Sequence, residues 1–142
     1  MWTTPGSLSL PRDPATPLVL VGPGTGVAPL RSVLHQRAAL AATGATVGPV
    51  LLFFGCRSAT ADCYYRAEWE ESQMRAVLWG GAVVVACSRD GGGKVYVQDR
   101  MREQGEAVWQ LLQGGAHVCV CGSASKMPQV RILWHARVHL CM

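Results

Sequence analysis

The chain of 142 residues contains no apolar stretch of about 20 residues, the length that a membrane-spanning helix needs. Residues 1–5 also lack the basic and apolar regions of a secretory signal. Long runs of lysine and arginine are missing as well, and the net charge of +4 is scattered along the sequence, which argues against nucleic-acid binding. The sequence therefore predicts a cytoplasmic protein whose partners include neither a membrane nor a nucleic acid.

No two of the six cysteines form a Cys-x-x-Cys pair. Several of them lie in or beside aliphatic runs, where buried thiols are common, so we expect a reducing compartment. His135 and His139 have the i, i+4 spacing of one helix face, with Cys141 nearby, but no second cluster supplies further metal ligands. We therefore expect no metal site and interpret this segment as a surface tail.

Charged residues make up only 15% of the chain and hydrophobic residues 49%, which fits one globular domain with a sizeable core. Short aliphatic runs predict four buried strands, over residues 18–21, 50–54, 82–87 and 117–121. Between them lie three predicted helices: one from Leu30 to a stop at Gly44, one over residues 64–74, and one over residues 97–112 with an interruption at Gly105. This alternation predicts an α/β fold, an open, mostly parallel twisted sheet flanked by helices.

A glycine-rich run, Gly22 to Pro29, links the first predicted strand to the first helix. It contains no lysine, which excludes the phosphate loop of ATPases, and its glycines do not have the Gly-x-Gly-x-x-Gly spacing of the common dinucleotide fingerprint. The run can be a plain structural turn. A helix start nevertheless offers unpaired backbone N–H groups to a phosphate, and the glycines would let it approach the backbone. Thr25 can either cap this helix or bond a phosphate oxygen.

Ligands of open parallel sheets bind beyond the carboxyl ends of the strands. Arg57, Arg89 and Lys94 follow the second and third predicted strands, and no loop at this edge begins with a carboxylate. An NAD site uses an acidic residue on the ribose 2′-hydroxyl, whereas an NADP site needs positive donors for the 2′-phosphate. The three cations favour NADP, although each of them can also be a solvated loop charge.

Four motifs at this edge resemble, in order and spacing, the NADPH-binding domain of the diflavin reductases, members of the ferredoxin-NADP reductase superfamily. The motifs are Gly22-Pro-Gly-Thr-Gly-Val-Ala-Pro29, Phe53-Phe-Gly-Cys-Arg57, Ser88-Arg89 with Lys94-Val-Tyr-Val-Gln98, and Cys121-Gly122-Ser-Ala124 with Met127. Within that family the chain looks most similar to the NADPH-dependent diflavin oxidoreductases, on three stretches: Phe53-Phe-Gly-Cys-Arg57, Ala67-Glu68-Trp69 and Val108-Trp109-Gln-Leu-Leu112. The resemblance covers about residues 5–130.

The resemblance implies a ferredoxin-NADP reductase C-terminal, Rossmann-like NADP-binding domain over residues 17–130. Residues 1–16 would be a remnant of the preceding FAD-binding barrel with its linker, and residues 131–142 a divergent tail. FAD and FMN would belong to the full-length parent, because this chain contains no complete flavin site. The tail does not match the last helix and strand of the family, so we expect a truncated product with one sheet edge uncovered.

The same resemblance implies roles for single residues. Cys121 would lie beside the nicotinamide at the point of hydride transfer, or it is a small core residue at a strand end. Ser123 stands where many relatives carry an acidic residue. The implied cofactor-binding residues are Gly24, Thr25, Gly26, Arg57, Ser88, Arg89, Lys94, Val95, Tyr96, Val97, Gln98, Gly122, Ser123 and Met127.

The implied reaction is hydride transfer from NADPH to FAD, with electrons passing through FMN to an acceptor protein of cytosolic iron–sulfur protein assembly. The isolated chain would bind the nucleotide weakly and would not turn over, since it contains no hydride acceptor. Two alternatives stay open. The chain can be a non-catalytic truncated isoform that serves as a nucleotide-binding or interaction fragment, or it can belong to a single-flavin reductase of the same superfamily.

Overall fold

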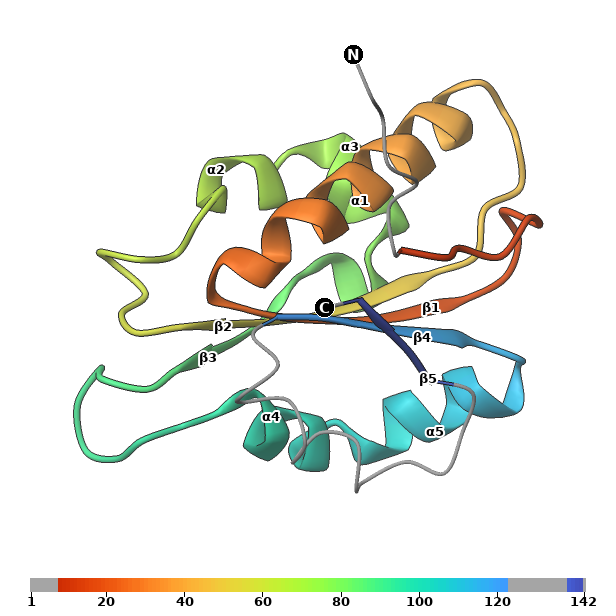
Figure 1. Cartoon of the computed structure of the whole chain (residues 1–142). Coiled ribbons are helices and arrows are strands. Elements are labelled where there is room, and N and C mark those ends of the chain that lie inside the picture. Colours follow the sequence, from red (N-terminus) through yellow and green to blue (C-terminus); the bar gives the residue numbers. More distant parts are fainter. Residues whose placement is uncertain (1–7, 123–137, 142) are drawn as a thin grey trace, which may run out of the picture.

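The computed structural model of the protein describes residues 8–122 and the backbone of residues 138–141 (Figure 1). Five parallel strands form one sheet in these residues, in the order β3-β2-β1-β4-β5. The strands are β1 (Leu18–Pro23), β2 (Val50–Cys56), β3 (Val84–Cys87), β4 (His117–Cys121) and β5 (Val138–Cys141). The predicted open, parallel α/β sheet is therefore confirmed.

Helices cover both faces of the sheet (Figure 1). One face carries α1 (Val27–Ala42), α2 (Arg66–Trp69) and α3 (Ser72–Val77), and the other carries α4 (Val97–Glu103) and α5 (Gly105–Gln113). Two short 3₁₀ turns, η1 (Gly24–Gly26) and η2 (Trp79–Gly81), complete the described elements.

Successive side chains of a strand point to opposite faces of the sheet, and this explains why the core has two layers. In β1, Leu18 and Leu20 pack toward α1, whereas Val19 and Val21 pack toward α4 and α5, and all four side chains are fully buried. A central strand of a parallel sheet that is covered on both faces has no polar side, so it reads as a continuous aliphatic run. This property made the strands visible in the sequence.

Two helix predictions are confirmed and one is wrong. The first helix ends at Ala42 before Gly44, which has a φ of 85°, and the expected interruption near Gly105 falls at Gln104, so that α5 begins at Gly105. The predicted helix over residues 64–74 is instead two short helices. Tyr65 has a left-handed φ of 60°, and Glu71, before α3, is extended. Since a residue in either conformation cannot continue an α-helix, the segment breaks at both points.

The expected uncovered sheet edge is also a wrong prediction. The backbone of β5 pairs in parallel with β4, from Val118 opposite Val138 to Cys121 opposite Cys141. An edge strand presents unpaired N–H and C=O groups, so a segment that can adopt an extended conformation is able to pair with it even when its side chains do not match a family pattern.

No helix among the described residues has the length and hydropathy to cross a bilayer.

Candidate functional site

A cavity of about 240 Å³ opens at the carboxyl ends of β1, β2 and β3. Its walls come from the loop after β1, the loop after β2 and the segment that joins β3 to α4. The sheet edge at which the sequence predicted a ligand site therefore does contain a cavity. Seven of the predicted cofactor-binding residues line it, namely Gly24, Arg57, Ser88, Val95, Tyr96, Val97 and Gln98.

The loop after β1 is shaped by two glycines with different constraints. Gly24 has a φ of 58°, a conformation that other residues rarely adopt, and nothing lies within 4 Å of the place where its Cβ would be. Gly26 has ordinary helical angles, but a Cβ there would lie 2.7 Å from the carbonyl carbon of Cys121 and 3.1 Å from the Cα of Gly122. The glycine at 26 thus permits the loop to touch the end of β4.

The start of α1 carries no side-chain cap, either at Gly26 or at Pro23, which precedes η1. Thr25 is exposed beside the backbone N–H groups at this helix start. Of the two roles that the sequence left open for its hydroxyl, capping is not observed. Helix α1 is long, and its first turn contains no acidic side chain that would neutralise the positive end of its dipole.

Three cations lie on the loops that follow β2 and β3, where the cavity opens. Arg57 lines it, while Arg89 and Lys94 lie on the exposed loop between β3 and α4. The N–H of Arg89 donates to the carbonyl of Arg57 at 2.8 Å, so the two loops run side by side. None of the three cations forms an ion pair within residues 8–122. The arrangement leaves their charges available to an anion.

The carboxylate next to Arg89 on the loop between β3 and α4 already accepts a hydrogen bond. Asp90 accepts a hydrogen bond of 2.6 Å from the N–H of Ala59, and this bond, together with one from Ser58, lowers the pKa of the Asp90 carboxyl. The acid therefore ties the loop after β3 to the loop after β2. It does so without pairing with the neighbouring Arg89 in the described residues.

Tyr96, on the segment between β3 and α4, presents an aromatic side chain at the wall of the cavity. It is 51% exposed, and it precedes the first turn of α4. Its N–H donates to Asp99 at 2.9 Å, and the N–H of Val95 donates to the carbonyl of Cys87, which holds the segment against β3. A ring that is fixed at its backbone and exposed at its face suits contact with a planar base.

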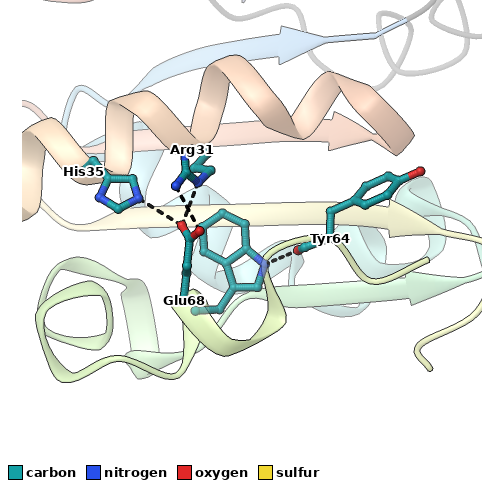
Figure 2. Close-up of polar contacts among 5 residues, drawn as sticks. Arg31, His35, Tyr64 and Glu68 are labelled. Carbon is teal, nitrogen blue, oxygen red and sulfur yellow. Dashed lines mark hydrogen bonds and ion pairs between the residues drawn. The ribbon is translucent and has the colours of Figure 1, made fainter. Parts of the chain in front are cut away.

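Tyr64 and Asp62 also line the cavity, and the sequence did not indicate either of them. A cluster behind the cavity wall fixes this segment (Figure 2). Trp69, buried in the core, donates its indole N–H to the carbonyl of Tyr64 at 2.9 Å. No spacing rule could have revealed this contact, because it depends on the left-handed turn at Tyr65.

Glu68 joins that segment to α1. Its carboxylate accepts two hydrogen bonds from Arg31, at 2.6 and 2.9 Å, and lies 3.0 Å from the ring of His35 (Figure 2). The bonds from Arg31 and His35 lower the pKa of Glu68, and the bond to Glu68 raises the pKa of Arg31. Arg31 also stacks on the ring of Tyr65, 4.8 Å from its centroid. The fork connects α1 to the cavity wall that holds Tyr64.

Cys121 is buried at the end of β4, and it is not among the described residues that line the cavity. Its backbone, with that of Gly122, abuts Gly26, so the first and fourth sequence motifs meet there. Ser123, Met127 and His135 lie outside the described residues, and of His139 the structure describes only the backbone, as part of β5. No cluster of side chains suited to a metal ion is found in the part of the chain that the structure describes.

A sequence profile of the oxidoreductase NAD-binding domain matches residues 20–131, more than half of the chain. The chain belongs to this family. The loop, the cavity and the strand ends described above all fall within the matched residues.

Individual relatives agree with the family. The chain is 48% identical over 123 residues to an NADPH–cytochrome P450 reductase of Aspergillus niger, which covers 85% of this chain. It is 46% identical over 129 residues, 90% of the chain, to NADPH-dependent diflavin oxidoreductase 1 of Bos taurus. It is also 47% identical over 118 residues, 83% of the chain, to the flavoprotein alpha-component of a sulfite reductase [NADPH] from Sodalis glossinidius. The chain spans only 17% to 20% of the length of these three relatives.

Proposed function

We propose that the chain binds NADPH in the cavity at the ends of β1, β2 and β3. The observation that carries the proposal is the group of three cations without ion pairs in the described residues, Arg57, Arg89 and Lys94, beside a cavity that also opens onto a helix start. The 2′-phosphate is the group that distinguishes NADPH from NADH, and cationic donors recognise it. The relatives named for NADPH support the same cofactor.

Residue roles follow from this placement and stay proposals. The N–H groups at Thr25 and Gly26, with the Thr25 hydroxyl, would hold the pyrophosphate, with Arg57 above it. Ser88, Arg89, Lys94, Tyr96 and Gln98 would bind the adenosine 2′-phosphate half, and the neighbouring Val95 and Val97 would close the wall. Cys121, Gly122, Ser123 and Met127 would lie toward the nicotinamide. Cys121 would position the ring through its place at the end of β4 and would not act as a nucleophile.

The parent reaction would be hydride transfer from NADPH to FAD, with electrons passing through FMN to an acceptor protein, as the diflavin relatives suggest. We propose further, on the resemblance given above, that the parent is a cytoplasmic protein that serves iron–sulfur protein assembly. Within the domain division given above, residues 17–130 would supply orientation of the nucleotide, and the flavin-binding parts of the parent would supply the acceptor. We expect no turnover from this chain without them.

A titration with 2′,5′-ADP tests the proposal directly. We expect saturable binding that is lost by a factor of about ten or more in Arg89→Ala, because a charge-assisted hydrogen bond contributes about 1.5–3 kcal/mol. Arg12→Ala is the matched control: it removes the same charge from an exposed residue before β1, on the side away from the cavity. Adenosine 5′-monophosphate, which lacks the 2′-phosphate, should bind both variants alike.

The outcome also separates the alternatives. Equal affinities of wild type and Arg89→Ala for 2′,5′-ADP would contradict the assigned phosphate site. A folded chain that binds no adenine nucleotide favours the interaction fragment. Brisk NADPH oxidation with ferricyanide in the absence of flavin would refute the expectation that the chain does not turn over by itself.

A further inference from the structure

Three thiols gather where β2 and β3 end. Cys56 and Cys87 are register partners on these neighbouring parallel strands, and their Sγ atoms lie 3.5 Å apart. Cys63, from the segment before α2, lines the same cavity as Cys87. The nucleotide site proposed above gives no task to any of these sulfur atoms, so the cluster requires its own explanation.

The paired cysteines differ in access. Cys56 is buried and belongs to the wall of the nucleotide cavity. Cys87 is partly exposed and lines a second cavity of about 340 Å³, which also contains Cys63 and is bounded by Trp69 and Arg66. A small reagent can therefore reach Cys87 through the second cavity without entering the first.

The pair is placed for a disulfide. Neighbouring strands lie about 4.7–4.9 Å apart, which falls within the range of about 4.4–6.8 Å between Cα atoms that disulfides require. The sulfur atoms already lie 3.5 Å apart, and a bond would bring them to about 2.05 Å. Only a small movement of two side chains at the strand ends separates the dithiol from the disulfide.

We propose that Cys56 and Cys87 form a reversible disulfide that weakens nucleotide binding, with a low-molecular-weight disulfide as the oxidant. In the first step the Cys87 thiolate attacks one sulfur of the small disulfide, forms a mixed disulfide and releases one small thiol. In the second step the Cys56 sulfur attacks Cys87, gives its proton to solvent and releases the second small thiol. The two cysteines are oxidised by two electrons together, and the small disulfide is reduced by the same two.

The order of the steps follows from the environments of the two thiols. Burial, with the hydrogen bond to Cys87 as a second cause, raises the pKa of Cys56 to about 12, so Cys56 stays protonated near neutral pH. It is therefore the resolving thiol, which reacts once Cys87 has been modified and lies 3.5 Å away. Cys87, which is open to the second cavity, meets the oxidant first.

The bond would act on the cationic wall of the nucleotide cavity. Cys56 directly precedes Arg57, and Cys87 directly precedes Ser88 and Arg89. The N–H of Ser88 donates to the carbonyl of Cys56 at 3.1 Å, so the two strand ends already form one connected unit. Drawing the sulfur atoms together changes the separation of the phosphate-binding side chains. This consequence rests on the proposed function, whereas the disulfide itself does not.

Mass spectrometry of the full chain tests the bond. After incubation with oxidised glutathione, we expect the intact mass of wild type to fall by two hydrogen atoms, with a peptide that links Cys56 to Cys87. Cys56→Ser should stop at a glutathione adduct on Cys87, and Cys63→Ser, the matched control, should form the bond as wild type does. A link that involves Cys63 in wild type, or a Cys56→Ser variant with no adduct on Cys87, overturns the assignment.

Titration with 2′,5′-ADP tests the effect. We expect the dissociation constant of wild type and of Cys63→Ser to rise about fivefold or more on oxidation and to return after dithiothreitol. The affinity of Cys87→Ser should not respond to the oxidant. A fully formed disulfide with unchanged affinity overturns the coupling to the nucleotide. If reduced wild type binds no 2′,5′-ADP, the proposed function fails, and the mass measurements still decide whether the bond forms.

Discussion

Gly26→Ala is expected to destabilise the protein severely, although the residue has ordinary helical angles. The added Cβ would overlap the carbonyl oxygen of Cys121, its nearest atom, and would lie 2.7 Å from the carbonyl carbon, where ordinary contacts begin at 3.4 Å, so the backbones have to separate by more than about 0.7 Å. Neither side can rotate away, because both are main chain. Overpacking costs about 1–3 kcal/mol, and we expect the upper end, about 3 kcal/mol, which corresponds to a melting temperature lower by about 10 °C.

Urea denaturation followed by circular dichroism measures this cost. Gly24→Ala is the matched control in the same loop, since its Cβ meets nothing within 4 Å and its φ of 58° should cost only about 1 kcal/mol. Asparagine tolerates the left-handed conformation and should restore part of that loss at residue 24, whereas at residue 26 it should be no better than alanine. A Gly26→Ala variant within about 0.5 kcal/mol of wild type would refute the close contact between the loop and β4.

Two further predictions concern buried and paired charges. Arg37 is only 5% exposed and donates to the carbonyls of Pro14 and Gly48, while burial lowers its pKa. Arg37→Met removes both hydrogen bonds and leaves the Gly48 carbonyl without this donor, although the Pro14 carbonyl still accepts from the N–H of Gly48. It should lower the free energy of unfolding in urea by about 1–3 kcal/mol, and a loss equal to that of the exposed Arg12→Met would contradict this. The pKa of Glu68 is lowered in the folded state, so its contribution is present above the unfolded pKa and disappears as pH falls through the folded one. Thermal melts of wild type and Glu68→Gln should therefore differ at pH 7 and converge as the pH falls from the unfolded pKa of about 4.3 through the lowered folded pKa, and a difference that persists at still lower pH would show that the Arg31 fork is not its cause.

Much of the fold was predictable because a strand that is buried on both faces has a continuous aliphatic sequence. The aliphatic runs that contain Leu20 and Leu52 are fully buried, and their spacing left room for crossover helices. The helix over residues 64–74 could not be excluded in advance, since Tyr65 carries no signal for a left-handed φ. Pairing of β5 with β4 was also invisible, because an edge is filled through backbone hydrogen bonds that any extended segment can make.

Of the residues in the candidate site, some were likewise predictable from the sequence and others were not. Gly24, Arg57 and Ser88 were predicted because ligands of parallel sheets gather at the carboxyl ends of strands, and the cavity lies there. Tyr64 was missed because its position depends on a bond from Trp69 and on the fork between Arg31 and Glu68, contacts between segments far apart in the chain.

The sequence by itself determined the architecture, the edge that carries the site and the positive charge beside it. These properties follow from hydrophobic periodicity and from residue types at strand ends, which are local. Only the tertiary structure decided that Gly26 touches the end of β4, that Tyr64 forms a cavity wall, and that Cys56 and Cys87 face each other across two strands. The reason is physical: each of these depends on the register and packing of elements distant in sequence, which no local pattern encodes.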